Sequence, residues 1–233
     1  MSQKNILITW DIDGTLIIGK STSRDHLEAF HLACENLFGK CDEPEKFLGH
    51  SIDGMMDSMI LSEMIEKLGF EANEENLCKG QKMMEEIFIK NCQDTPEVPV
   101  GIADTLKELS KYPNVTCAIA SGNYEKIAWR KLELGGIAQY FPDKIGGLGV
   151  VKDRKDALLL ARKIAEEKKG LKFDIIMHVG DTPNDIIAAQ KAGAIPFGVR
   201  TGRVHYPNYP TPSYVFDNII VGHDQFMKLL ELE

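Results

Sequence analysis

The sequence lacks the features of a membrane, secreted or nucleic-acid-binding protein. No apolar run approaches the roughly 20 residues that a membrane-spanning helix needs. An apolar run begins near Asn5, which leaves no room for a cleaved signal peptide before it. The 27 basic residues are outnumbered by 35 acidic ones, so the net charge is -8. An acidic surface repels nucleic acid and anionic lipid, and we expect neither as a partner.

Cysteine is scarce, and its spacing matches no zinc site. The five cysteines are Cys34, Cys41, Cys78, Cys92 and Cys117. An odd number of scattered cysteines predicts reduced thiols and a cytoplasmic protein. Internal repeats and low-complexity tracts are also absent. The 233 residues suit one large domain, or a core with a smaller insert, as a monomer or a homodimer.

Short apolar runs alternate with helical patterns in the first residues and in the second half of the chain. The runs predict buried strands at Ile6–Trp10, Val115–Ala120, Ile175–Val179 and Ile195–Val199, with a weaker one at Lys144–Leu148. Helices are predicted at Ile102–Lys111, Tyr124–Leu134, Arg154–Lys168 and Pro183–Ala192. This alternation predicts an α/β fold with a doubly wound parallel sheet, a Rossmann-like core. In such sheets, ligands bind beyond the carboxyl ends of the strands.

The segment between the first strand and Pro96 has a different pattern. It contains no strand-like run, and helices are predicted at Arg24–Phe38, Ile52–Leu68 and Asn73–Asn91. We therefore expect two domains: residues 1–17 and 97–233 form the catalytic core, and residues 18–96 form an inserted helical domain.

Two carboxylates, Asp11 and Asp13, follow the first predicted strand. Paired carboxylates can hold a hard cation, or divide the roles of nucleophile and acid/base. Gly14 allows the chain to turn sharply after them. A plain acidic turn would explain these residues equally well if they stood alone.

Two further clusters lie at helix starts. Ser121–Asn123 combines a hydroxyl with backbone N–H groups, which makes an anion site or an ordinary serine N-cap. Lys152, Arg154 and Lys155 crowd the start of another helix, where cations oppose the helix dipole. Nearby anions would explain these cations, although a solvated basic run is the alternative.

The last cluster, Gly180–Asp185, follows the strand at Ile175–Val179. Pro183 suits the first turn of a helix, so Asp181 and Asp185 can face the same crevice. Asp181 could instead cap the helix, with Asp185 favouring its dipole. All four clusters lie at one edge of the predicted sheet, which favours a shared site.

The four clusters, in this order, resemble the motifs of the haloacid dehalogenase superfamily. Its D-x-D-G-T motif corresponds to Asp11–Thr15, its Ser/Thr to Ser121, its Lys/Arg to the group at Lys152–Lys155, and its G-D-x-x-x-D to Gly180–Asp185. The stretch Ser121–Phe141 is similar to the phosphoglycolate-phosphatase-like branch. The inserted helical segment matches the cap domain of that branch.

The resemblance implies a magnesium-dependent phosphatase that hydrolyses a small phosphorylated metabolite through an aspartyl-phosphate on Asp11. Asp13 would be the acid/base, and Ser121, Gly122 and Asn123 would bind the phosphoryl group with a cation. Of the basic residues we favour Lys152 over Arg154 as that cation.

The resemblance also implies the metal ligands. Mg²⁺ would be bound by Asp11, the backbone carbonyl of Asp13, and Asp181, with Asp185 in support. In the cap, His50 and Ser51 follow Gly49 in a loop that resembles the substrate-specificity loop of the branch. The branch often has Arg or Lys where this chain has His50.

Other activities on the same fold remain alternatives. A phosphomutase or another hydrolase would keep these motifs. A haloacid dehalogenase needs no metal and lacks the second aspartate, so Asp13, Asp181 and Asp185 argue against it. A non-catalytic regulatory protein would have lost at least one motif residue, and none is missing.

Overall fold

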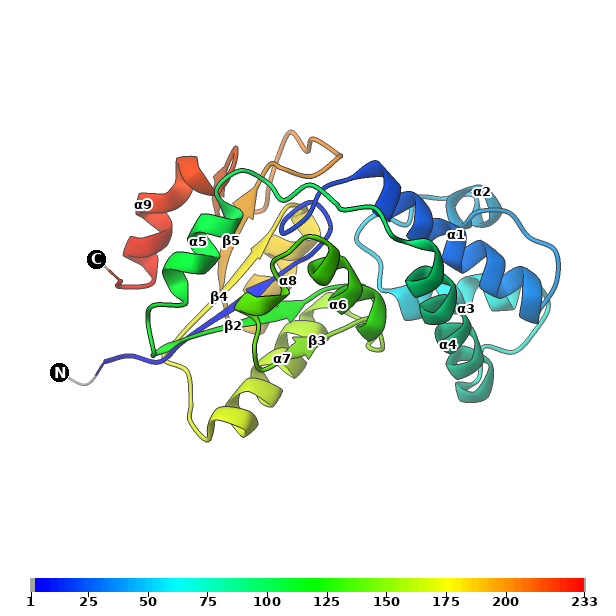
Figure 1. Ribbon diagram of the computed structural model, residues 1–233, viewed down its shortest axis with the longest axis horizontal. Coiled ribbons are helices and arrows are strands. Elements are labelled where there is room, and N and C mark those ends of the chain that lie inside the picture. The colour runs from blue at the N-terminus through cyan, green and yellow to red at the C-terminus, as the bar shows by residue number, and fades with distance from the viewer. Residues whose placement is uncertain (1–2, 233) are drawn as a thin grey trace.

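A six-stranded parallel sheet forms the centre of the computed structural model, which describes residues 3–232 (Figure 1). The strand order is β3-β2-β1-β4-β5-β6. The strands are β1 (Ile6–Trp10), β2 (Val115–Ala120), β3 (Gly146–Gly147), β4 (Ile175–Gly180), β5 (Ile195–Val199) and β6 (Tyr214–Phe216). Every paired strand is parallel to its neighbour, so the carboxyl ends of the strands share one edge.

Helices cover both faces of the sheet. They are α5 (Ile102–Leu109), α6 (Glu125–Leu134), α7 (Arg154–Lys169), α8 (Pro183–Ala192) and α9 (Ile219–Leu229), with a short 3₁₀ turn at Ala138–Tyr140. Helices α5, α6 and α9 contribute to the largest apolar cluster, on one face. Helices α7 and α8 pack on the other face. This is the predicted doubly wound α/β fold.

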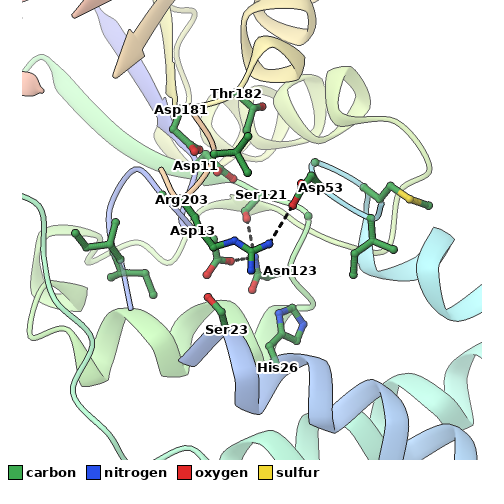
Figure 2. A pocket seen from close by; sticks show the side chains of 18 of the residues that line it. Asp11, Asp13, Ser23, His26, Asp53, Ser121, Asn123, Asp181, Thr182 and Arg203 are labelled. Carbon is green, nitrogen blue, oxygen red and sulfur yellow. Dashed lines mark hydrogen bonds and ion pairs between the residues drawn. The ribbon is translucent and has the colours of Figure 1, made fainter. Parts of the chain in front are cut away.

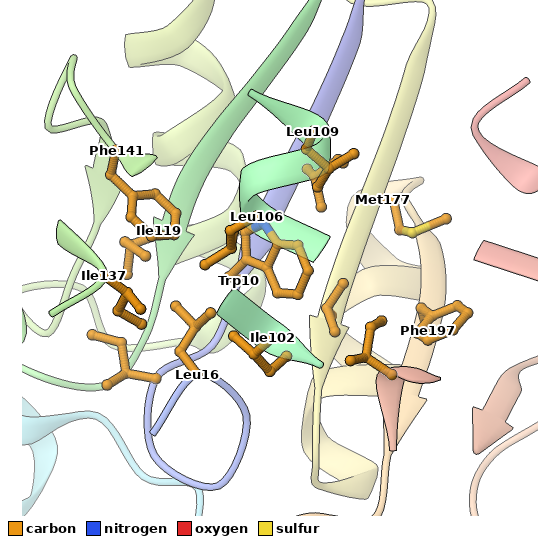
Figure 3. Packing of buried hydrophobic residues seen from close by; sticks show 14 of the residues in the cluster. Trp10, Leu16, Ile102, Leu106, Leu109, Ile119, Ile137, Phe141, Met177 and Phe197 are labelled. Carbon is orange, nitrogen blue, oxygen red and sulfur yellow. The ribbon is translucent and has the colours of Figure 1, made fainter. Parts of the chain in front are cut away.

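Strand β1 shows why its apolar run is continuous. Ile8 and Trp10 belong to the large apolar cluster. Figure 3 shows Trp10 in this cluster with Leu106 and Ile119. Leu7, which precedes Ile8, points to the opposite face and packs with Ala165 of α7. Since alternate residues of a strand face opposite sides, a strand covered on both sides must be apolar throughout.

The inserted helices form a second body at one end of the sheet (Figure 1). They are α1 (Lys20–Leu37), α2 (Pro44–Leu48), α3 (Asp57–Lys67) and α4 (Glu74–Asn91). Their apolar cluster includes Phe30 and Phe88, and it extends to Tyr124 and Ile127 at the start of α6. The predicted fold class, a parallel sheet with an inserted helical cap, is confirmed. We call α1–α4 the cap.

The two chain segments that join the cap to the core lie side by side. Ile18 and Glu97 pair as an antiparallel bridge, with N–H to carbonyl distances of 2.7 and 2.8 Å. This pairing falls at the predicted junctions, although the exact domain bounds remain a prediction.

Three elements were not predicted: α2, β6 and α9. Helix α2 has only five residues and β6 only three, so neither gives a periodic signal. None of the helices in the described part of the chain is both long and apolar enough to cross a membrane. Within residues 3–232 the five cysteines are free thiols.

Candidate active site

The strand register brings the predicted motifs to one place. Trp10 of β1 pairs with Ile119 of β2 and with Val179 of β4. The residues that follow these strand positions therefore emerge at the same edge of the sheet. They line a cavity of about 650 Å³ whose opposite wall is formed by the cap (Figure 2).

Three carboxylates, Asp11, Asp181 and Asp185, gather at this edge. Each offers an oxygen within 4.8 Å of the others, and all three side chains are buried. Burial, together with the neighbouring Asp185 and Asp13, raises the pKa of Asp11 to about 6, although Arg154 opposes this shift. Burial, Asp185 and Asp11 raise the pKa of Asp181 well above its usual value. Such a cluster of buried like charges favours a bound cation.

Asp185 differs from the other two carboxylates because protein donors surround it. Its Oδ2 accepts hydrogen bonds from the backbone N–H of Thr182 at 2.9 Å and from the hydroxyl of the same residue at 2.6 Å. Burial would raise the pKa of Asp185, but Arg154 and a hydrogen bond from His178 hold it below its usual value. Asp185 thus closes a capping box at the start of α8.

Arg154 is the basic residue that reaches the carboxylates. Its Nη1 donates to Asp11 Oδ1 at 2.9 Å and to Asp185 Oδ1 at 2.6 Å. Asp153 caps α7, which makes Arg154 the first helical residue. Lys152 precedes this cap, is exposed, and lines a separate hollow with Met59. This placement differs from our expectation for Lys152 and assigns the position beside Asp11 to Arg154.

The turn after β1 requires glycine. Gly14 has φ of 91°, and a Cβ on it would overlap with the carboxylate of Asp181. Two residues of the loop after β5 form hydrogen bonds with the backbone of Gly14 and Asp181. Thr201 Oγ1 donates to the carbonyl of Gly14 at 2.5 Å, and the hydroxyl of Tyr209 donates to the carbonyl of Asp181 at 2.7 Å.

Asp13 points away from the three carboxylates, toward a lysine of α6. Lys131 Nζ lies 2.8 and 2.7 Å from the two carboxylate oxygens of Asp13, and Asn123 Nδ2 donates to Oδ2 at 2.8 Å. Burial alone would raise the pKa of Asp13, but Lys131, His26 and Asn123 hold it below its usual value. Asp13 keeps 38% of its side-chain surface exposed to the cavity.

Ser121 lines the cavity beside Asn123, near Asp13 (Figure 2). It is buried, and its Oγ accepts a hydrogen bond from Asn123 Nδ2 at 2.9 Å. Its own hydroxyl proton is therefore available to a ligand. Gly122, the next residue, lies against the cap: a Cβ there would meet the carbonyl oxygen of Met55 at 2.5 Å.

The predicted specificity residues do not line the cavity. His50 is exposed, and its Nε2 lies 2.8 Å from Glu63 Oε2 on the cap surface. Ser51 is also exposed, but its Oγ donates to Asp53 Oδ2 at 3.1 Å. The cavity is lined instead by the following residues of the same loop, 52–55. The part of this loop that faces the cavity begins at Ile52, two residues after His50.

The cavity residues that were missed from the sequence include His26 on α1, Lys131 on α6 and Arg203 after β5. A signal for Lys131 was present. It occupies an apolar position of α6, four residues after Ile127 and one before Leu132, both of which are buried. The loop that carries Arg203 has no periodic pattern, so its position required the folded chain.

Known proteins resemble this chain in sequence and in fold. A family model described as haloacid dehalogenase-like hydrolase matches residues 7–193. The chain belongs to this family. The predicted family and the prediction of an enzyme are thereby confirmed, since residues 7–193 contain all four motifs.

Curated relatives agree with this assignment. The phosphoglycolate phosphatase of Vibrio parahaemolyticus is 26% identical over 225 residues, which cover 94% of this chain and 95% of the relative. Phosphoglycolate phosphatase 1 of Pseudomonas aeruginosa is 33% identical over 129 residues, 53% of this chain and 45% of the relative. The chain is a phosphatase of this family, a phosphoric monoester hydrolase.

Solved structures share the fold. CbbY from Rhodobacter sphaeroides, in complex with phosphate, has a TM-score of 0.67 at 16% identity, covering 93% of this chain and 95% of CbbY. A predicted phosphatase from Clostridium acetobutylicum has a TM-score of 0.65 at 18% identity, covering 97% of this chain and 100% of the neighbour.

Proposed function

We propose that the chain is a magnesium-dependent phosphatase that hydrolyses a small phosphate monoester through an aspartyl-phosphate intermediate. The observation that carries the proposal is the convergence of Asp11, Asp181, Asp185, Arg154 and Ser121 at one strand edge. Carboxylates suit a hard cation, and the guanidinium and hydroxyl suit a phosphoryl group.

The buried residues fit a divalent metal ion. Asp11, Asp181 and Asp185 carry three negative charges, and Arg154 supplies one positive charge. Asp181 has few protein donors: Thr15 Oγ1 lies 3.5 Å from its Oδ1. We propose that Asp11, Asp181 and the backbone carbonyl of Asp13 hold Mg²⁺, with Asp185 orienting the site. When bound, the ion would neutralise charge on the phosphoryl oxygens and on Asp11.

The phosphoryl group would be held by Ser121 and Arg154. Arg154 Nε is buried without a hydrogen-bond partner among residues 3–232, which is the kind of donor that a phosphoryl oxygen satisfies. A carboxylate oxygen of Asp11 then attacks phosphorus, and the bond from phosphorus to the ester oxygen breaks. Asp13 gives a proton to the leaving oxygen and later takes one from the water that releases inorganic phosphate.

The direct test is release of inorganic phosphate from p-nitrophenyl phosphate, followed by a panel of phosphorylated metabolites that includes phosphoglycolate. We expect turnover with added Mg²⁺. Transfer of the phosphoryl group to another hydroxyl, in place of release, would favour the phosphomutase alternative. Absence of turnover on every ester would contradict the proposal.

Replacement of Asp13 by Asn should depend on the leaving group. An alkoxide needs a proton to leave, whereas p-nitrophenolate does not, so Asp13→Asn should slow alkyl phosphates about 100-fold and aryl phosphates far less in the phosphorylation step. Single-turnover rates with the two ester types measure the difference. Equal losses would indicate that Asp13 serves the metal alone.

Arg203 is our candidate for reading the leaving group. It lines the cavity, is exposed, and its Nη2 lies 3.7 Å from Asp53 Oδ1 of the cap, a pair that a ligand can displace (Figure 2). If the substrate carries a carboxylate, as phosphoglycolate does, Arg203→Met should raise KM about fivefold for that ester and leave p-nitrophenyl phosphate unaffected.

Two variants control this prediction. Arg200, three residues earlier, pairs with Asp217 and does not line the cavity, so Arg200→Met should change neither KM. His50→Ala should likewise have little effect, because His50 pairs with Glu63 outside the cavity. A larger loss from His50→Ala than from Arg203→Met would return the specificity role to His50.

A further inference from the structure

A buried lysine lies at the junction of the cap and the core. Lys131 of α6 has no exposed side-chain surface. Its Nζ contacts Asp13 at 2.7 and 2.8 Å, Asn123 Oδ1 at 2.6 Å and His26 Nδ1 at 3.3 Å. His26 belongs to the cap, and Figure 2 shows it on the same side of the cavity as Asp13 and Asn123.

The hydrogen bonds of this cluster form one consistent set. An ammonium group has three donors and no acceptor, and the Lys131 Nζ lies within hydrogen-bond distance of four acceptor atoms on three residues. His26 Nδ1 must then accept from Lys131, so its proton is on Nε2, which lies 3.0 Å from Asp57 Oδ2. Asn123 accepts at Oδ1, so its Nδ2 donates to Asp13 and Ser121. Each donor orientation follows from the Lys131 ammonium.

A purely structural role would not require a charge here. Burying an ammonium group is costly, and an apolar side chain of similar length would pack beside Phe88, whose ring centroid lies 5.9 Å from Lys131 Nζ. A bidentate contact with a carboxylate is well suited to fix one orientation of that carboxylate.

We propose that Lys131 is a positioning residue that holds the ionised Asp13 carboxylate in the orientation needed to take a proton from the attacking water, and that His26 and Asp57 complete this arrangement when the cap lies against the core. The proposal rests on the proposed function, because it assigns Lys131 to the acid/base step of that reaction.

The contribution of the cap follows from Asp57. Its Oδ2 accepts from the backbone N–H of Tyr124 at 2.8 Å, and its own N–H donates to the carbonyl of Gly122 at 2.9 Å. These bonds join the start of α3 to the segment that carries Ser121 and Asn123. Withdrawal of the cap would remove the His26 contact from Lys131.

The test is a double-mutant cycle between Lys131→Met and Asp13→Asn. Lys131→Met should slow hydrolysis of the aspartyl-phosphate, followed in single turnover, about tenfold or more, and should change the rate of phosphorylation by p-nitrophenyl phosphate less than about threefold. In the Asp13→Asn background the same change should have almost no effect, because the residue through which Lys131 acts is gone. Lys163→Met, an exposed position of α7, is the control for loss of a lysine.

Losses that add in the double variant, or an unchanged rate of aspartyl-phosphate hydrolysis in Lys131→Met, would overturn the proposal. A crystal structure of Lys131→Met gives a readout independent of turnover. It should show Asp13 turned away from Asn123, and an unchanged Asp13 would overturn the proposal even if the chain hydrolysed no ester tested. Should Lys131→Met fail to fold, His26→Ala tests the cap contact, with a smaller loss in the rate of aspartyl-phosphate hydrolysis expected.

Discussion

Asp11→Asn is expected to reduce turnover by about 10⁴-fold or more, the scale on which loss of a nucleophile acts in other enzymes. A carboxylate oxygen attacks phosphorus because it is charged, whereas the amide oxygen is neutral. Asn has nearly the same shape as Asp, and its carbonyl oxygen can still accept the hydrogen bond from Arg154. The loss should therefore occur without loss of the fold.

Steady-state phosphate release measures the loss, and thermal unfolding checks the fold. Acid quenching of the wild-type enzyme during turnover, followed by mass spectrometry, should place a phosphoryl group on Asp11. Asp174→Asn is a matched control, because Asp174 lies at the opposite end of β4 and accepts from the backbone of Asn5. A phosphoryl group on another residue, or substantial activity in Asp11→Asn, would contradict the mechanism.

Whether a strand is covered on both faces explains how well its bounds could be predicted from the sequence. Strands β1, β2 and β5 have the predicted bounds, because a strand covered on both faces is a continuous apolar run. Strand β3 has only two residues, and its Gly147 lies against the backbone of α7, where a Cβ would overlap with Ala157. The pairing of β3 depends on this close approach, which produces no clear pattern of hydrophobic residues in the sequence.

The site residues likewise divide into those that the sequence could place and those that it could not. Asp11, Ser121 and Asp181 follow strands, and their convergence follows from parallel strand order. The choice between Lys152 and Arg154 depends on which residue caps α7, and a shift of one or two residues turns a side chain to another face. No spacing in the sequence indicates that residues such as His26 and Lys131 meet across the junction of the cap and the core.

Asp181→Ala should raise the Mg²⁺ concentration needed for half-maximal activity about 10- to 100-fold, the range found when ligands or their supporting residues are removed elsewhere. Asp181 is buried beside Asp11, and it has fewer protein donors than Asp185. The negative charge of Asp181 therefore depends more on a bound cation for its neutralisation than the charge of Asp185 does. Asp185→Ala should have a smaller effect on Mg²⁺ affinity, because Asp185 contacts Arg154 and the capping box of α8.

Calorimetric titration of Mg²⁺ into each variant measures affinity without turnover, and activity against Mg²⁺ concentration measures the requirement. Asp156→Ala, at a half-exposed carboxylate on α7, is the control for loss of a negative charge. EDTA should abolish wild-type activity, and excess Mg²⁺ should restore it. Full activity in EDTA would contradict the metal assignment. Normal Mg²⁺ affinity in Asp181→Ala would move the ion away from Asp181 while leaving Asp11 as the nucleophile.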